Sequence, residues 1–264
     1  MDTIQAIILG IVQGLTEFLP VSSSGHLQIA KALLGVSIEE NLLFDVTLHA
    51  ATVLSTIVVL RREVARLLCG LFSRRFGEEQ AYVLKLLLSM IPIGIVGFAC
   101  KDRLDALLES PAILLVVGCM LLATAALLAF AYYARPREKG SISYRDAFII
   151  GVAQAAAALP GLSRSGATIA AGLLLGNRKE AVAQFSFLMV LAPILGETFL
   201  ELAKGGAVAQ SVGTAPLAAG FAAAFVVGCL ACRFMIEVVK RGKLIWFALY
   251  CAAAGAVSVL SYIL

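Results

Sequence analysis

The residues of this chain that are able to do chemistry gather in two short polar stretches, each set inside apolar sequence. The first reads Gln-Gly-Leu-Thr-Glu-Phe-Leu-Pro-Val-Ser-Ser-Ser-Gly-His over residues 13–26, and the second reads Pro-Gly-Leu-Ser-Arg-Ser-Gly-Ala-Thr over residues 160–168. Buried polar groups are costly unless they find partners, and ionisable groups inside a membrane mark functional sites. Both stretches are therefore candidate parts of a functional site.

In the first stretch, Gln13 and Glu17 are four residues apart and share one face of a helix. Pro20 ends that helix, and the Ser-Ser-Ser-Gly run over residues 22–25 predicts a turn followed by the start of a second helix. Such a start binds anions through free backbone N–H groups and the positive end of the helix dipole. His26 is a candidate nucleophile or general acid-base.

The second stretch adds Arg164, a permanent cation whose planar fork of donors suits phosphate oxygens. At membrane depth it needs an anionic partner, either Glu17 or a bound phosphate. The oxygens of Glu17 and Gln13 suit a hard cation such as Mg²⁺ or Ca²⁺. Together these groups point to phosphoryl transfer, in which catalysis is mostly positioning and charge neutralisation. The predicted substrate-binding residues are Ser22, Ser24, Gly25, Gly161, Ser163, Ser165, Gly166 and Thr168.

The composition places these stretches in a helical integral membrane protein. The chain has 61% hydrophobic and 14% charged residues, against about 45–50% and about 25% in soluble domains. Long apolar runs recur where a barrel would show short alternating strands. The net charge of +4 is better interpreted by position than as a sign of nucleic-acid binding, so no nucleic-acid partner is expected.

Six apolar segments have about the length of a membrane span, and two longer ones are broken in the middle. The spans are predicted at 42–60, 82–100, 111–134, 181–203, 212–232 and 244–264. The broken segments, 4–35 and 146–176, are predicted to be re-entrant helix-loop-helix hairpins. They resemble each other, and three spans follow each of them. We therefore expect a single all-α membrane domain over 1–264, with a first repeat over 1–135 and a second, inverted repeat over 145–264.

The distribution of Lys and Arg predicts the topology. With two re-entrant hairpins, fifteen of the eighteen cations outside apolar segments lie on one side, and only Lys101, Arg103 and Lys204 lie on the other. Full crossing of both hairpins would give a ten-to-eight split. The positive-inside rule favours the first arrangement. It places both termini and the mouth of the first hairpin outside, and the mouth of the second hairpin in the cytoplasm.

The motifs resemble those of a known family over the whole chain. The Gln-x-x-x-Glu at 13–17, the Ser-Ser-Ser-Gly-His at 22–26 and the Pro-Gly-x-Ser-Arg-Ser-x-x-Thr at 160–168 are similar to the signatures of the undecaprenyl-diphosphate phosphatases, also called UppP or BacA. The resemblance implies hydrolysis of the diphosphate of a C55 isoprenoid carrier in the bacterial plasma membrane. It also implies a role in cell-wall synthesis, bacitracin resistance and dependence on a divalent cation. The family carries Glu or Gln at the leading position, and Gln13 leaves one carboxylate here.

The resemblance also implies roles for single residues. Glu17 is expected to be a metal ligand or base with Gln13 as a supporting ligand, and Ser23 or His26 the nucleophile or its activator. Arg164 is expected to hold the diphosphate, with Ser163, Ser165 and Thr168 around it. Asp45 and His49 share a helix face after the first hairpin, either as outer partners of the site or as a polar rim.

Two questions stay open at this point. A transporter or flippase for a lipid phosphate or another anion would need the same grip on phosphate. The combination of Glu17, Ser23 and His26 favours an enzyme, because binding alone needs no nucleophile or proton carrier. Monomer and homodimer are both compatible with the sequence.

Overall fold

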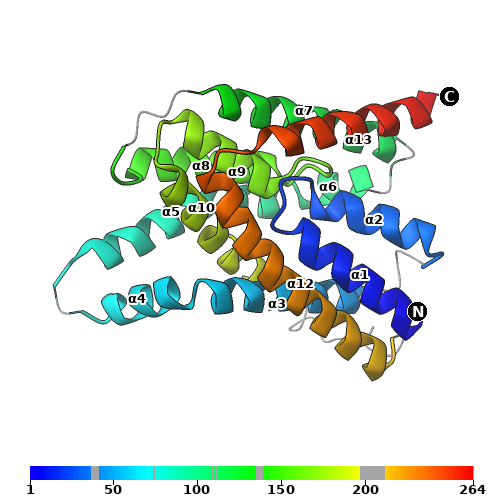
Figure 1. The fold of residues 1–264 in the computed structure, drawn as a ribbon, viewed down its shortest axis with the longest axis horizontal. Coiled ribbons are helices and arrows are strands. Elements are labelled where there is room, and N and C mark those ends of the chain that lie inside the picture. The colour runs from blue at the N-terminus through cyan, green and yellow to red at the C-terminus, as the bar shows by residue number, and fades with distance from the viewer. Residues whose placement is uncertain are drawn as a thin grey trace.

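The computed structural model of the protein describes residues 1–36, 42–73, 75–108, 110, 112–134, 139–196 and 212–263. Every helix or strand element in these ranges is an α-helix (Figure 1). The helices are α1 (Thr3–Thr16), α2 (Ser23–Leu33), α3 (Leu42–Val59), α4 (Arg61–Leu71), α5 (Glu78–Ala99), α6 (Lys101–Leu108), α7 (Ile113–Tyr133), α8 (Tyr144–Ala156), α9 (Arg164–Leu174), α10 (Lys179–Met189), α12 (Thr214–Lys240) and α13 (Ile245–Ile263).

Five of these segments are long and apolar enough to cross a membrane: α5, α7, the stretch Lys179–Gly196 that begins with α10, α12 and α13. A sixth crossing exists if α3 and α4, which are bent by 82° at Leu60, count as one span. The predicted spans therefore have helical counterparts, except that residues 111, 197–203 and 264 of these segments lie outside the described residues. The prediction of an all-helical, multi-pass membrane protein is confirmed.

Both polar stretches interrupt a pair of short helices, as expected. The first separates α1 from α2 and contains Pro20, and the second separates α8 from α9 and contains Pro160. Ser163 caps α9, because its Oγ accepts a hydrogen bond from the Gly166 N–H at 3.1 Å. Ser22 precedes α2 with a φ of 72°, a left-handed conformation that is uncommon for a residue other than glycine. The breaks therefore turn the chain sharply at both polar stretches.

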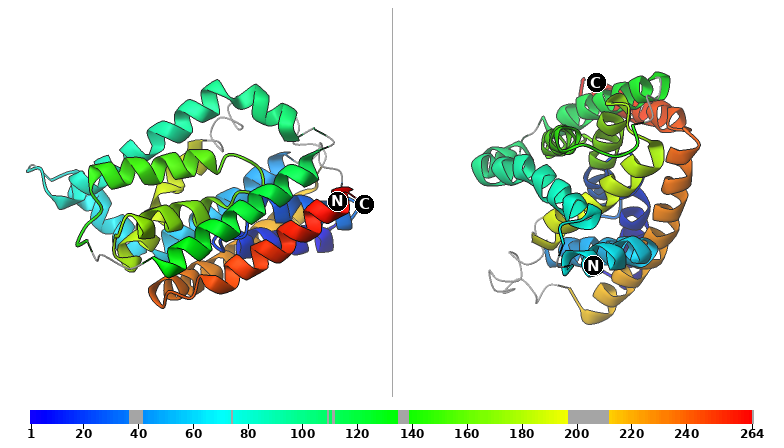
Figure 2. Two further views of the ribbon diagram at one scale, coloured as in Figure 1. Left: turned by 90° about the horizontal axis from the view of Figure 1, so that it is seen from above. Right: turned by 90° about the vertical axis from the view of Figure 1, so that its left-hand side faces the viewer.

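The short helices pack closely against long helices from the other half of the chain. A Cβ atom at Gly14 of α1 would lie 2.6 Å from the Ala224 carbonyl oxygen of α12. A Cβ at Gly151 of α8 would lie 2.3 Å from the Ser89 carbonyl oxygen of α5. Small residues let helix backbones approach in this way inside membranes. Figure 1 shows α1 lying beside α12, and both chain ends lie at the same end of the long axis in Figures 1 and 2.

Candidate active site

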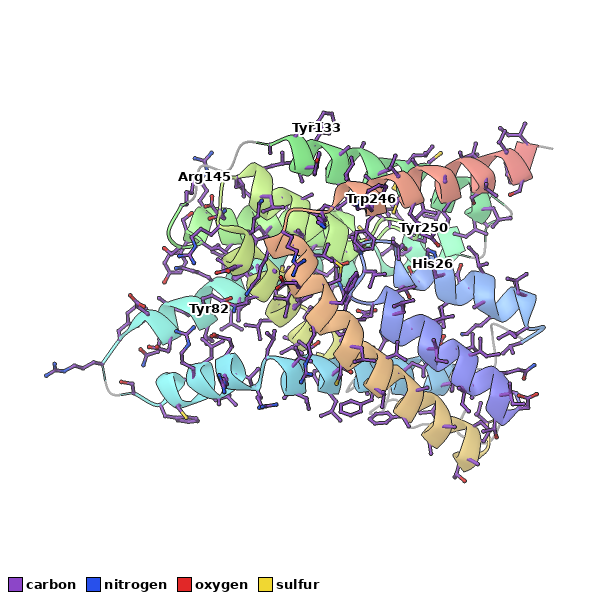
Figure 3. The ribbon with its side chains drawn as sticks, in the orientation of Figure 1. His26, Tyr82, Tyr133, Arg145, Trp246 and Tyr250 are labelled. Atoms are coloured by element: carbon purple, nitrogen blue, oxygen red, sulfur yellow. The ribbon has the colours of Figure 1, made fainter. Side chains whose placement is uncertain are left out.

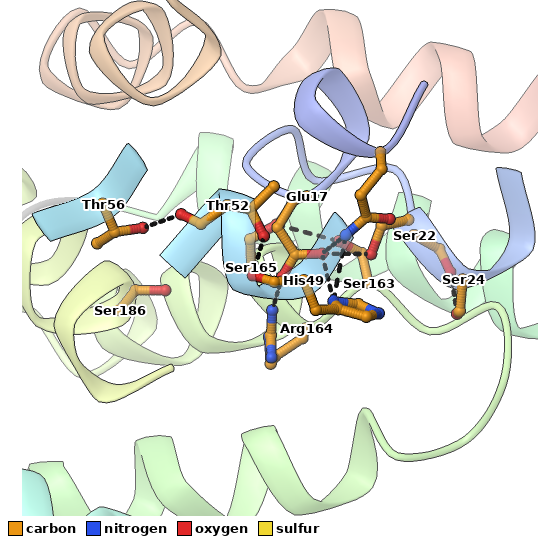
Figure 4. A network of polar contacts seen from close by, with 12 residues as sticks. Glu17, Ser22, Ser24, His49, Thr52, Thr56, Ser163, Arg164, Ser165 and Ser186 are labelled. Atoms are coloured by element: carbon orange, nitrogen blue, oxygen red, sulfur yellow. Dashed lines mark hydrogen bonds and ion pairs between the residues drawn. The ribbon is translucent and has the colours of Figure 1, made fainter. Parts of the chain in front are cut away.

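Glu17 is the centre of the site. It follows the last residue of α1, and its side chain is only 3% exposed. Oε2 accepts hydrogen bonds from Ser23 Oγ at 2.8 Å and from Gln13 Nε2 at 3.0 Å, while Oε1 pairs with the Arg164 guanidinium (Figure 4). Gln13 reaches Glu17 because four residues make one helical turn, and Ser23 reaches it because the chain reverses at Pro20. The structure thus brings both polar stretches together at one carboxylate.

Arg164 belongs to the tip of the second hairpin, which is held by several contacts. The Ser165 hydroxyl donates to the Leu19 carbonyl oxygen of the first hairpin at 3.2 Å, and lies 3.3 Å from Ser163 Oγ. The backbone N–H of Ser163 donates to Thr124 Oγ1 of α7 at 3.0 Å. Gly161 has a φ of +94°, and a Cβ there would lie 2.6 Å from the Val117 carbonyl oxygen of α7. Glycine is therefore required at Gly161 by both its conformation and its space.

His49 of α3 joins the site beside Gln13 and Glu17. Its Nδ1 lies 3.2 Å from Gln13 Nε2 and 3.9 Å from Glu17 Oε2. Sequence spacing alone left open whether His49 was an outer partner of the site or part of a polar rim, and these distances favour the former. Asp45, one turn earlier, pairs instead with the buried Lys31 at 2.6 Å and so ties α2 to α3.

His26, Ser22 and Ser24 form hydrogen bonds with groups other than Glu17. His26 Nδ1 contacts the Ser22 carbonyl oxygen at 2.9 Å, and Nε2 contacts the Tyr250 hydroxyl of α13 at 2.5 Å. The Ser22 and Ser24 hydroxyls lie 3.4 Å from each other. Among the described residues, no hydrogen bond joins His26 to Glu17 or to Ser23. The structure therefore groups Ser23 with Glu17 and places His26 in a second polar group at the start of α2.

A pocket runs from the Glu17–Arg164 pair between α3 and α10. Its polar wall adds Thr52 and Thr56 of α3 and Ser186 of α10, whose Oγ lies 2.6 Å from Thr168 Oγ1. Ser165 also lines the pocket, and the remaining lining residues are apolar: Phe18, Val53, Phe187, Val190 and Ile194. The sequence analysis did not predict the hydroxyls of Thr52, Thr56 and Ser186 as part of the site, although two threonines four residues apart in an apolar span indicate a shared polar face.

Beside Glu17, Gln13 offers an amide oxygen that no protein group among the described residues uses. Gln13 is fully buried, and its Oε1 atom has no hydrogen-bond partner. No group of three or more His, Cys, Asp or Glu suited to a metal occurs in the part of the chain that the structure describes. Mg²⁺ is usually bound by one or two carboxylates together with substrate phosphates and water. One carboxylate and a free amide oxygen match that donor set.

Membrane-length helices that enclose a carboxylate, a guanidinium and several hydroxyls define a multi-pass membrane protein with a buried polar site. The chain matches the family described as bacitracin resistance protein BacA over residues 6–257, and it belongs to that family.

Curated relatives carry the name undecaprenyl-diphosphatase. The protein from Parabacteroides distasonis is 60% identical over 262 residues, which cover 98% of each chain. The protein from Bacteroides thetaiotaomicron is 57% identical over 97% of each chain, and the one from Christiangramia forsetii is 51% identical over 98% of each. The similarity therefore includes both hairpins and the helices around them.

Proposed function

We propose that this protein hydrolyses undecaprenyl diphosphate to undecaprenyl phosphate and inorganic phosphate. The observation that carries the proposal is the buried network in which Glu17 accepts from Ser23 and pairs with Arg164, within a member of the BacA family. Relatives of 51–60% identity over nearly the whole chain are named for this activity. The reaction regenerates a lipid carrier for cell-wall synthesis in the bacterial inner membrane, and bacitracin resistance follows from it.

Arg164 is assigned the role of binding the diphosphate through its guanidinium. Its side chain is 28% exposed and lines the pocket, while one guanidinium nitrogen contacts Glu17. A planar guanidinium binds two phosphate oxygens at once, and a fixed positive charge stabilises the charge that develops during phosphoryl transfer. When the diphosphate takes over the guanidinium, Glu17 loses its ion pair and becomes a stronger base towards Ser23, which contacts Oε2.

Glu17 is assigned the role of general base and Ser23 that of nucleophile or water-positioner. The 2.8 Å separation of Ser23 Oγ from Glu17 Oε2 is within reach for proton transfer. In the covalent route, Oγ gives its proton to Glu17 and bonds to the terminal phosphorus, while the bond from that phosphorus to the bridging oxygen breaks. Water then hydrolyses the phosphoserine. In the direct route, Ser23 orients the water that Glu17 deprotonates.

His26 is assigned the role of general acid, which gives a proton to the leaving lipid phosphate. The imidazole lies at the start of α2, separate from the base, so that acid and base act on different oxygens of the diphosphate. The Ser22, Ser24, Gly25, Ser163 and Gly166 positions line the two helix starts, where the positive ends of the helix dipoles favour phosphate oxygens.

A divalent cation, Mg²⁺ or Ca²⁺, is proposed to bind at Glu17 and the free Oε1 of Gln13 together with the substrate. When bound, it neutralises phosphate charge and shields the diphosphate from Glu17. The free Oε1 of Gln13 beside the Glu17 carboxylate supports this, and among the described residues no cluster of three or more His, Cys, Asp or Glu holds an ion without the diphosphate.

The membrane topology is proposed to be an inverted repeat with two re-entrant hairpins. In support, α1 packs on α12 of the second half, and α8 packs on α5 of the first half. Each half thus places its first short helix against a long helix of the other half, as two equivalent repeats would. The unequal distribution of Lys and Arg supports both termini outside, with the site opening to the outer face. A homodimer stays a prediction, and cross-linking in native membranes tests it.

The activity is tested with purified protein in detergent by measuring phosphate release from the C55 diphosphate and from farnesyl diphosphate, with and without a chelator. Glu17→Gln should abolish release, while Glu237→Gln, which alters an exposed carboxylate of α12, should leave it unchanged. Transport of the intact diphosphate without phosphate release would favour the flippase alternative and refute hydrolysis.

A further inference from the structure

The closest polar contact of His26 comes from the last helix of the chain. Tyr250 of α13 lies near His26 (Figure 3). Its hydroxyl is 2.5 Å from His26 Nε2, and the two rings are stacked with centroids 5.6 Å apart and an interplanar angle of 25°. We propose that Tyr250 is a positioning residue that holds the His26 imidazole for proton transfer. The proposal deepens the proposed function and rests on the role of His26 in it.

The two contacts of the imidazole determine where its protons lie. The Ser22 carbonyl oxygen can only accept, so the Nδ1 atom that lies 2.9 Å from it must carry a hydrogen. In the neutral ring, Nε2 is then the lone-pair atom and accepts from the Tyr250 hydroxyl. In the imidazolium, Nε2–H donates to the same hydroxyl, because a phenol both donates and accepts. Tyr250 thus holds Nε2 in both protonation states of the ring, and when substrate is bound the leaving phosphate oxygen takes the place of the hydroxyl and receives the Nε2 proton.

The neighbouring residue fixes Tyr250 at this point of the site. Cys251 is fully buried, and its Sγ donates to the Pro20 carbonyl oxygen at 3.3 Å. It packs with Val21, which is also buried, at the turn of the first hairpin. The register of α13 against that turn is therefore set beside Tyr250. As a consequence, a helix from the second half of the chain supplies a contact to the polar stretch of the first half, which no motif in the sequence shows.

The bond itself is tested by ¹⁵N NMR of protein labelled at histidine, in detergent. The chain has only two histidines, so His26 and His49 are assigned with a single variant. Tyr250→Phe keeps the stacked ring and removes the hydroxyl, and it should shift the His26 Nε2 signal without moving those of His49. Tyr262→Phe, which alters an exposed tyrosine on the same helix, should move neither. An unchanged Nε2 signal in Tyr250→Phe would overturn the proposal.

The consequence for the reaction is tested with the same variants. Tyr250→Phe should lower kcat for the C55 diphosphate by roughly 10- to 100-fold, the scale of a misplaced catalytic group. It should cause no further loss in a His26→Ala background, whereas a residue that only supports the fold would lower turnover in both backgrounds. Equal losses in both backgrounds, or full activity of Tyr250→Phe, would refute the positioning role.

The failures of the two proposals are distinguishable. Wild-type turnover by His26→Ala would remove His26 from the mechanism and the role of Tyr250 with it. Reduced turnover by His26→Ala together with an unaffected Tyr250→Phe would leave the proposed function intact and overturn the inference about Tyr250 alone.

Discussion

Replacing Arg164 by lysine tests the central contact of the site, because lysine keeps the positive charge and loses the planar fork of donors. The Glu17 side chain that Arg164 pairs with is only 3% exposed. Removal of one partner from a buried ion pair costs about 3–5 kcal/mol, since the remaining charge is left without compensation. Arg164→Lys avoids most of that cost, so the variant should stay folded and report on catalysis.

The expected loss of activity follows from the donors that lysine lacks. An arginine that stabilises a transferring phosphoryl group contributes roughly 10³–10⁵ in rate, and the loss of one well-placed donor alone costs about 10²–10³ in kcat. Arg164→Lys should therefore reduce kcat by at least roughly 10²-fold. The loss should appear in kcat and not in KM alone, because the second phosphate contact strengthens as charge develops in the transition state.

The assay is phosphate release from the C55 diphosphate, with thermal unfolding of the same samples in detergent. Arg178→Lys is the matched control, because Arg178 is 53% exposed and pairs with Glu180 at the surface at 3.4 Å. This control should keep full activity and stability. Arg164→Ala should unfold at a lower temperature than Arg164→Lys, since it leaves Glu17 uncompensated. Near-normal turnover by folded Arg164→Lys would show that two-point binding of phosphate by the guanidinium is wrong.

Three further predictions concern the cation, the packing and the topology. Gln13→Glu should lower the concentration of Mg²⁺ that gives half-maximal activity, because it adds a second carboxylate beside Glu17; an unchanged Mg²⁺ requirement would contradict a cation at this place. Gly151→Ala should destabilise the protein by about 1–3 kcal/mol in thermal or denaturant unfolding, because the new methyl group meets an α5 carbonyl oxygen 2.3 Å away. The control Gly94→Ala should have little effect, because a methyl group there would have no atom within 4 Å. In a background without native cysteines, a cysteine at Ser110 should react with a membrane-impermeant thiol reagent in intact cells and one at Gly77 should not, and the reverse pattern would contradict the proposed orientation.

Local sequence patterns were enough to predict the helices, the two breaks between short helices and the residues around Glu17. Apolar runs of membrane length predict spans because the hydrocarbon core of the bilayer favours them wherever they lie in the chain. Pro20 and Pro160 predict the two helix breaks because proline removes a backbone donor and clashes with the preceding turn. The contacts of Gln13 and Ser23 with Glu17 are also short in sequence, four and six residues apart, so helix geometry and one chain reversal suffice for them.

The remaining parts of the site depend on how distant helices cross and on their rotation about their own axes. His49 meets Gln13, and Tyr250 meets His26 across 224 residues, because close packing brings α3 and α13 beside the first hairpin. Ser186 lines the pocket for the same reason. The membrane-length helices α5, α7, α12 and α13 are apolar around most of their surface, so composition does not reveal which face turns inward. The sequence by itself determined the helices, the breaks and the residues near Glu17, and the packing of helix on helix decided which side chains from other elements complete the site.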